Sequence, residues 1–540
     1  MIGRRDWLGA AAAAPLVTLA ACTRDETPRW TSRWVGASHE RGHRLRAASI
    51  DRAAPATTRR AEVLIVGAGV SGLAAARRLD AAGIADVQVF DLEDRAGGNS
   101  RGHQLGGIAC PLGAHYLPVP DEHALEVIEL LDALGLRKIE HGVPVYDERH
   151  LCHSPQERLF IEGHWHEGLL PPVEALPAAQ RDATLAQYRR FGVEVERAGV
   201  FRIPTARAPW TPAHAALDAL SFATWLDRGG FDAPALRWHL DYCCRDDYGA
   251  GAAQVSAWAG LHYFASRHGF HPPGSGDDTR DAVLTWPQGN GWLTERIAQP
   301  LQDRIHAGCT ALRVAEGRHE VTLDVHVESR AQVERWVAPQ LIVALPLFVA
   351  LRLLEDAPPA LRSVVPAMRH APWLVANLQL TSPLTDRPGA PPSWDNVLYG
   401  GPSLGYVDAM HQATRPYPGP TVLTAYWALG GDNDAQLNAQ RQRLIDDSAE
   451  AWARAVVQDL ARAHADLPAR IAQVDLMRYG HAMSVPVPGL RGHPALAALA
   501  EPRGRVHFAH ADLSGYSVFE EAMYHGVRAA TAVQRALGRA

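Results

Sequence analysis

Residues 64–79, LIVGAGVSGLAAARRL, restrict the fold of this chain more than any other stretch. The run EVLIV at 62–66 leads into Gly67, Gly69 and Gly72, which have the spacing GxGxxG, and an alanine-rich segment follows. The first glycine permits a tight turn, the second lets the backbone approach a pyrophosphate, and the third lets a helix lie close to the strand. The amides at the start of such a helix attract phosphate. The stretch therefore predicts a strand, a phosphate-binding turn and a helix in a doubly wound α/β domain.

The same unit continues into a second predicted strand, VQVF, which ends at Asp91. A carboxylate roughly 20 residues beyond the glycine turn binds the hydroxyls of a ribose and would repel the 2′-phosphate of NADP. Together the turn and the acid indicate an adenine dinucleotide, either NAD or FAD.

The residues after Asp91 distinguish these cofactors through a resemblance. DLEDRAGGNSRG, at 91–102, resembles the corresponding segment of the flavin amine oxidase family, in which an acid is usually followed by xxxRxGGR. Asn99 stands where the family usually has Arg, and we expect Arg101 to take over that phosphate contact. LGAHYL, at 112–117, resembles the family's loop beside the flavin ring. The resemblance implies FAD, with an NAD-binding domain as the alternative.

Three later segments, at 286–301, 340–354 and 504–530, resemble the places where the chain of this family returns to its FAD domain. In the last of them, the wider flavoprotein pattern implies that Asp512 binds the ribityl chain. The helix from about Ser517 would then direct its positive end at the flavin and favour the reduced anion. The residues that we expect to contact FAD are Gly67, Gly69, Ser71, Gly72, Asp91, Arg95, Gly97, Gly98, Asn99, Arg101, Gly113, Ala114 and Asp512.

The resemblance implies a two-domain α/β protein, with a doubly wound, Rossmann-like FAD domain and a mixed α+β substrate domain. The expected FAD domain comprises residues 61–130, 285–355 and 475–540. The expected substrate domain comprises residues 131–284 and 356–474. Because no cysteine follows Cys309, a cysteinyl link to the flavin is not expected, and FAD should be bound non-covalently.

The N-terminus has the charged, apolar and small-residue regions of a signal peptide at 1–21. RRDWL resembles a twin-arginine export signal, and LAAC resembles a lipoprotein cleavage box that would leave a lipid on Cys22. We therefore expect an exported, periplasmic lipoprotein anchored to the membrane, in which residues 22–60 form a tether that Trp30 and Trp34 could dock in part. The alternative is a cytoplasmic protein with a disordered tail. Twin-arginine routes carry folded cargo, which is consistent with a cofactor acquired in the cytoplasm.

Charge and ligand spacing exclude two other classes of site. The formal net charge is −6 and no basic patch is evident, which argues against nucleic-acid binding. The 26 histidines include no HExxH or similar spacing, so no metal site is expected.

Candidate substrate residues occur at 239–270. Asp246 and Asp247 are adjacent, and Trp258 and His262 have the i,i+4 spacing of one helix face. An acidic mouth with aromatic walls suits a cationic amine, and Tyr479 could form a further wall. The competing interpretation is that the aspartates lie in a solvated loop and that the aromatic face is core.

Catalytic candidates come from the segments expected near the flavin. His115 and His510 are candidate proton relays, with a structural hydrogen bond as the alternative for each. Tyr516 and Glu521 lie where the family shapes the substrate channel. The family's lysine near flavin N5 has no counterpart, because the only lysine, Lys138, comes far earlier. We therefore expect a dehydrogenase that transfers hydride from a carbon bonded to nitrogen to flavin N5 and passes electrons to an unknown acceptor.

Two other functions fit the same pattern. An FAD-dependent desaturase or isomerase would have an apolar tunnel without carboxylates near the flavin. A non-catalytic exported flavoprotein, acting as a binding or assembly factor, would have a flavin sealed from small molecules.

Overall fold

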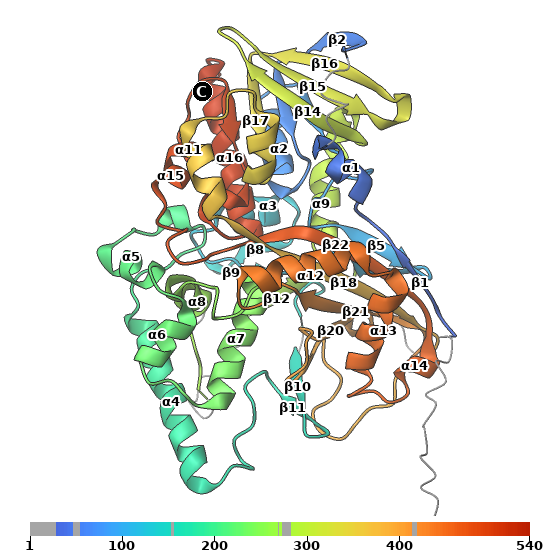
Figure 1. The fold of residues 1–540 in the computed structure, drawn as a ribbon, viewed down its shortest axis with the longest axis vertical. Helices are drawn as coiled ribbons and strands as arrows, with labels where there is room; N and C mark the ends of the chain where they lie inside the picture. Colours follow the sequence, from blue (N-terminus) through green and yellow to red (C-terminus); the bar gives the residue numbers. More distant parts are fainter. Residues whose placement is uncertain are drawn as a thin grey trace, which may run out of the picture.

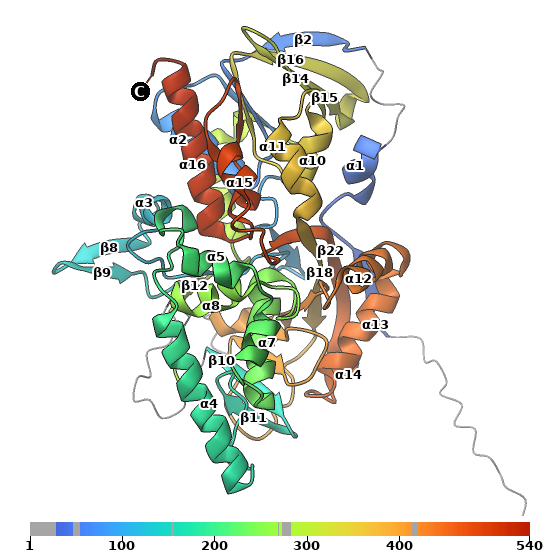
Figure 2. The same ribbon diagram turned by 60° about the vertical axis from the view of Figure 1, so that its left-hand side comes forward.

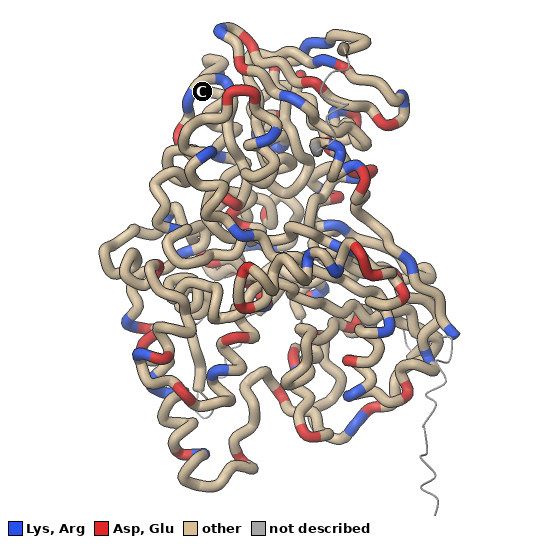
Figure 3. Tube along the Cα trace, in the orientation of Figure 1, with Lys and Arg blue, Asp and Glu red and all other residues tan. Residues whose placement is uncertain are grey.

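The computed structural model describes residues 29–46, 54–152, 156–267, 269–272, 282–412 and 418–539. Cys22 and the expected signal peptide lie outside these residues. In the described part, no helix combines the length and the apolar character that crossing a bilayer requires. Acidic and basic residues are interspersed along both halves of the described chain (Figure 3).

A parallel sheet of five strands forms the first domain, and it confirms the expected doubly wound α/β class (Figure 1). Its order is β13-β4-β3-β17-β23. The bounds are Ile305–His306, Val87–Phe90, Val63–Val66, Gln340–Val343 and Val506–Phe508 in that order. All four residues of the central strand β3 are buried, as a strand covered on both faces requires. Three distant parts of the chain thus meet in one sheet, whose carboxyl ends share an edge.

Helices cover both faces of the parallel sheet. α2 (Val70–Ala81) and the last helix, α16 (Phe519–Ala536), pack against each other, and α9 (Gly291–Ala298) contacts α2. The further helices of this half are α3 (Leu125–Ala133), α10 (Leu347–Leu353), α11 (Pro359–Val364) and α15 (Pro494–Ala500). The third glycine of the turn, Gly72, already lies in α2, so this helix begins directly after the turn at the carboxyl end of β3.

A small four-stranded sheet, in the order β14-β15-β16-β2, flanks the parallel sheet (Figure 1). The bounds are Cys309–Glu316, Val321–Val327, Gln332–Ala338 and Thr57–Arg60. The first three strands are antiparallel neighbours, whereas β2 joins β16 in parallel from the N-terminal part of the chain.

A mixed sheet of eight strands, in the order β1-β22-β18-β21-β20-β19-β10-β11, forms the second domain. The bounds are Thr31–Trp34, Ile471–Val485, Arg369–Leu380, Thr421–Ala428, Tyr406–Asp408, Asp395–Leu398, Glu157–Ile161 and His164–Glu167. Alternate residues of β18 face two different cores. Leu374 and Ala376 pack with the helices of one face, and Trp373 and Val375 pack with those of the other.

The helices of the second domain follow this division (Figures 1 and 2). One group covers the Leu374 face: α12 (Asp434–Asp446), α13 (Ala449–Leu460) and α14 (Leu467–Arg470). The other group comprises α4 (Ala178–Arg197), α5 (Pro212–Asp218), α6 (Phe222–Arg228), α7 (Pro234–Tyr248) and α8 (Ala257–Ala265).

Short two-stranded sheets complete the structure. They are formed by β5 (Gly102–Leu105) with β6 (Ile108–Pro111), β7 (Tyr116–Pro118) with β12 (Val283–Thr285), and β8 (Arg137–Glu140) with β9 (Val143–Tyr146). The β8–β9 hairpin projects from the body, and it carries Lys138 (Figure 2).

Two expected boundaries differ from this structure. Residues 475–485 belong to β22 of the mixed sheet, so the segment 475–540 does not lie wholly in the parallel-sheet domain. The expected tether at 22–60 is docked more extensively than expected in the part that the structure describes. Trp30 and Trp34 do pack on the body, and β1, α1 (His39–His43) and β2 are docked as well. Their pairing is made by backbone groups, which leave little pattern in the sequence.

Candidate active site

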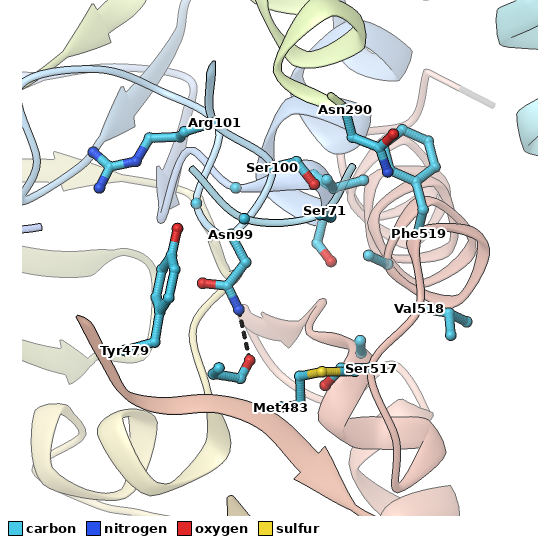
Figure 4. A pocket seen from close by; sticks show the side chains of 18 of the residues that line it. Ser71, Asn99, Ser100, Arg101, Asn290, Tyr479, Met483, Ser517, Val518 and Phe519 are labelled. Carbon is cyan, nitrogen blue, oxygen red and sulfur yellow. Dashed lines mark hydrogen bonds between the residues drawn. The ribbon is translucent and has the colours of Figure 1, made fainter. Parts of the chain in front are cut away.

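A cavity of about 440 Å³ lies at the carboxyl ends of β3, β4, β17 and β23, and residues of the mixed-sheet domain complete its wall. This edge is where open α/β sheets bind their ligands. Figure 4 shows Ser71 and Asn99 on the side of the glycine turns, and Tyr479 and Met483 on the facing strand β22. Asn99 joins the two sides, since its Nδ2 donates to the Ala482 carbonyl at 2.6 Å.

The glycine turn has no room for side chains. A Cβ at Gly72 would lie 1.8 Å from the Gly67 carbonyl oxygen, and Gly67 itself has a φ of +101°. A Cβ at Gly98 would lie 3.0 Å from the Gly69 Cα, so two glycine turns touch at the cavity. Gly69 is the N-cap of α2 and provides no side-chain cap. The helix amides are thus directed at the cavity, which fits a pyrophosphate.

Acidic residues follow the second strand. The Asp91 carboxylate accepts the Ala68 N–H at 2.7 Å and the Glu93 N–H at 2.8 Å, and it therefore fixes the glycine turn as well as lining the cavity. Arg101 Nη1 lies 3.7 Å from Glu93 Oε2, while the buried Arg101 Nε has no hydrogen-bond partner among the described residues. Burial raises the pKa of Asp91 and of Glu93. An unmatched guanidinium donor next to two acids and a glycine cradle fits the diphosphate and ribose of a dinucleotide.

Four residues of the expected cofactor set, Asp512 among them, do not reach the cavity wall. Arg95 is exposed, and Gly72 and Gly97 lie behind the turns that they shape. The remaining members of the set line the cavity: Gly67, Gly69, Ser71, Asp91, Gly98, Asn99, Arg101, Gly113 and Ala114.

Asp512 has a structural position. Its carboxylate accepts the Leu347 N–H at 2.8 Å and lies 3.1 Å from His370 Nε2 and 3.2 Å from His510 Nδ1. Burial opposes its ionisation, but the two imidazoles hold the pKa of Asp512 well below its usual range. Asp512 is fully buried, and the cavity wall contains His510 and Ala511 instead. This placement corrects the expectation that Asp512 contacts the ribityl chain.

Aromatic side chains line the opposite end. His115 stacks on Tyr426 with ring centroids 4.3 Å apart, and Tyr116 and Trp373 also line this part. Burial lowers the pKa of His115 to about 3, so this candidate relay is neutral near pH 7. The Tyr479 hydroxyl donates to the Leu112 carbonyl at 2.7 Å, which fixes its ring at the cavity wall.

Acidic groups gather at this aromatic end. Asp246 accepts the Tyr116 hydroxyl at 3.3 Å, and burial and the neighbouring Asp247 raise the pKa of Asp246 to about 7. Asp247 pairs with Arg267 at 3.0 Å. Glu520, in the first turn of α16, lines the cavity with 5% of its surface exposed, and burial raises its pKa to about 7. The only cation of this group is thus already paired with one of three acids.

Four expected site residues lie in the core. Glu521 is fully buried and accepts the Thr205 N–H at 2.6 Å and the Tyr516 hydroxyl at 2.9 Å. Trp258 and His262 do share one face of α8, and His262 packs against Tyr516 with ring centroids 5.3 Å apart. None of the four lines the cavity. This corrects the expected catalytic positions of Glu521 and Tyr516. For Trp258 and His262 it agrees with the competing interpretation, in which the aromatic face is core.

Sequence reasoning missed several wall residues, chiefly Glu520, Arg267, Tyr426 and Ala37. Glu520 adjoins the residue that we selected, and only the start of α16 decides which of the two acids faces inward. Tyr426 lies in an apolar strand and carried no signal. Among the described residues, no group of three or more His, Cys, Asp or Glu side chains is placed to hold a metal ion.

Comparison with known proteins agrees with this site. The family model for flavin containing amine oxidoreductases matches residues 70–534. An L-amino acid dehydrogenase of Synechocystis sp. is 24% identical over 488 residues, which are 87% of this chain and 94% of that protein. Putrescine oxidase of Kocuria rosea is 29% identical over 180 residues, 32% of each chain. The first curated relatives are matched over about a third of their length or less.

A solved structure shows the same fold. Cyclohexylamine oxidase of Brevibacterium oxydans superimposes with a TM-score of 0.63 at 21% identity, covering 88% of this chain and 99% of that one.

Proposed function

Because this chain belongs to the flavin-containing amine oxidoreductase family, we propose that it removes hydride from a carbon bonded to nitrogen in a small, polyamine-like cation. Membership of the family makes the protein an FAD-dependent oxidoreductase. The class of its substrate is our inference, and the observation that carries it is a group of three cavity-facing acids that, among the described residues, has Arg267 as its one cation.

The cavity fits a non-covalently bound FAD. The touching turns at Gly69 and Gly98 would hold the diphosphate, Arg101 would supply the donor that is now unmatched, and Asp91 would take the ribose hydroxyls. FAD, when bound, accepts hydride at its ring nitrogen N5. The protein binds and orients FAD and the substrate, and its own side chains take up the proton.

The acidic end of the cavity favours a cationic ligand. Asp246, Asp247 and Glu520 line it together with a single cation, Arg267, which pairs with Asp247. Buried carboxylates without a cation are costly to ionise, and an ammonium group would restore the balance of charge. The neighbouring faces of Tyr116 and Trp373 suit the same group through cation–π attraction.

These acids also suit the proton transfer that amine oxidation requires. An alkylammonium ion must lose a proton before its neighbouring carbon can release hydride, and a base works best when its pKa lies near the working pH. Asp246 and Glu520, with a pKa of about 7 each, meet that condition, whereas His115, with a pKa of about 3, does not. We assign proton acceptance to the two acids, and to His115 the role of a neutral wall.

The test is an anaerobic panel of mono-, di- and polyamines, amino acids and unsaturated lipids, followed by bleaching of the flavin and reoxidation by a dye. We expect the amines to bleach the flavin, and Asp246→Asn and Glu520→Gln to weaken this response. Bleaching or isomerisation by lipids alone would favour the desaturase or isomerase. A flavin that no small molecule reduces would favour a binding or assembly factor.

We also propose that the protein is exported and carries a lipid on Cys22, and that its electrons pass to a carrier. Support comes from the N-terminal sequence and from the cavity wall, where the described residues include no lysine. Mass spectrometry of the mature N-terminus tests the first proposal. A diacylglyceryl cysteine is expected, and an intact Met1 would contradict it.

A further inference from the structure

The N-terminal segment 31–45, here called the strap, connects three parts of the molecule (Figures 1 and 2). Its first strand, β1, pairs in parallel with β22 from Thr31↔Gln473 to Trp34↔Leu476. Arg33 forms two hydrogen bonds, of 2.9 and 3.0 Å, with the fully buried carboxylate of Asp475. The strap is therefore firmly attached to the mixed sheet at this end.

Its second attachment is the loop that follows β4 in the other domain. The Ser38 N–H lies 3.2 Å from both oxygens of Glu93. Arg41 Nη1 donates to the Leu92 carbonyl at 3.1 Å and to Asp94 at 2.6 Å. Between the two attachments, Ala37 lines the cavity beside Asp91, Leu92 and Glu93. The strap thus crosses the mouth of the cavity where the second strand of the parallel sheet ends.

The crossing depends on a single glycine. Gly36 has a φ of +82°, and a Cβ there would lie 2.3 Å from the buried Met477 Sδ. The next residue, Ala37, donates its N–H to the same sulfur at 3.2 Å. A side chain at Gly36 would be strained by its backbone conformation and would displace the end of the Met477 side chain, which accepts the Ala37 N–H, so it should loosen the strap.

The end of the second strand is where a dinucleotide places its adenosine ribose. The strap covers this end, and its Ser38 N–H and the nearby Arg101 hold Glu93 in place. We propose that the strap forms the outer wall of the adenosine site and retains FAD, so that the cofactor leaves only after the strap undocks. The strap precedes residue 70, where the match to the family model begins, and no part of the comparison assigns it a role.

The inference rests on the proposed cofactor, and its test measures cofactor release instead of turnover. Purified holoprotein is diluted into FAD-free buffer, and release is followed by the rise in fluorescence of free FAD. Gly36→Ala should release FAD at least about tenfold faster than the unaltered protein, because it loses the packing and the hydrogen bonds of one wall. Gly42→Ala is the matched control: it lies in α1, where a Cβ meets no atom within 4 Å, and it should release FAD at the original rate.

Limited proteolysis of the strap separates the outcomes. Faster cleavage and faster release together in Gly36→Ala support the proposal. Faster cleavage with an unchanged release rate overturns it and leaves the proposed function intact. The strap has a third attachment, since Arg44 pairs with Glu328 beside the small four-stranded sheet. If Gly36→Ala does not fold, Arg33→Ala, Arg41→Ala and Arg44→Ala together loosen all three attachments without adding an atom. An unchanged release rate in that variant overturns the proposal equally. A wild-type protein that binds no FAD would end both proposals.

Discussion

The affinity of the cavity for a cationic amine should rise with pH, because two of the acids that face it titrate near neutrality. The pKa of Asp246 and that of Glu520 are both about 7. An acid with such a pKa is ionised in about a tenth of molecules at about pH 6 and in about nine tenths at about pH 8. An alkylamine, with a pKa near that of lysine at about 10.4, stays protonated over this interval. The change in charge therefore belongs to the protein.

The expected magnitude follows from the number of acids involved. If the ammonium requires one ionised acid, its affinity should increase roughly tenfold between about pH 6 and about pH 8, and up to roughly a hundredfold if both must be ionised. The groups that face these acids are Asp247, which forms an ion pair with Arg267 at 3.0 Å, and Tyr116, whose pKa burial raises far above this interval.

Anaerobic stopped-flow reduction of the flavin measures this directly. The half-saturating amine concentration reports binding, and the limiting rate separately reports loss of the ammonium proton and hydride release. Asp246→Asn and Glu520→Gln should each flatten the pH dependence of the half-saturating concentration, and the double variant should abolish it. Asp182→Asn removes an equal charge from the exposed surface of α4 and should keep the original profile. A flat profile in the unaltered protein, or an unchanged profile in the double variant, would refute the assignment of these acids.

Three further outcomes are expected from the same structure. Gly72→Ala places a Cβ 1.8 Å from the Gly67 carbonyl oxygen and should lower the free energy of unfolding by about 3 kcal/mol and abolish FAD binding, whereas Gly480→Ala, where a Cβ meets no atom, should leave denaturant unfolding unchanged. Asp247→Asn leaves the buried Arg267 without its partner and should cost about 3–5 kcal/mol in denaturant unfolding, much of which Arg267→Met should restore in the double variant. The reduced flavin should reoxidise slowly in air and quickly with a dye acceptor, and equal rates would contradict the assignment as a dehydrogenase.

The glycine turn could be predicted from sequence because its causes are local. Gly67 and Gly72 are required by backbone conformation and by close approach, so the strand, turn and helix follow from one short stretch. Asp91 could also be placed, because a strand of four residues leaves little freedom in where its end lies. The parallel-sheet domain was predictable to the extent that such local signals repeat in the right order.

The sequence alone could not show which acids line the aromatic end of the cavity. Glu520 and Glu521 are neighbours at the start of α16, and successive residues of a helix point about 100° apart. A shift of one residue in the helix start exchanges the acid that faces the cavity for the one that bonds Tyr516 in the core. Likewise, a shift of one residue in the short turn after β23 would exchange Ala511, which lines the cavity, for Asp512, which is fully buried.

The docking of the N-terminal segments, the strap and β2, was hidden for another reason. β2, with the sequence TTRR, is exposed along its whole length and is held by backbone pairing with β16. Such a strand leaves no alternation of apolar and polar residues to recognise. The sequence does not show why residue 36 has to be a glycine. The reason lies in its contact with Met477, which is more than 400 residues away in the chain.

Two carboxylates, Asp246 in the cavity wall and Asp512 buried beside it, show how partners decide the role of an acid. Burial alone would raise the pKa of both Asp512 and Asp246. Asp512 has two imidazoles and a backbone N–H within hydrogen-bonding distance, so it remains an anion and fixes the end of β17 to the end of β23. Asp246 has a tyrosine hydroxyl and another acid beside it, so its charge is incomplete until a cation arrives. Permanent charge therefore holds the scaffold of the cavity, and conditional charge at the aromatic end would recognise the proposed amine.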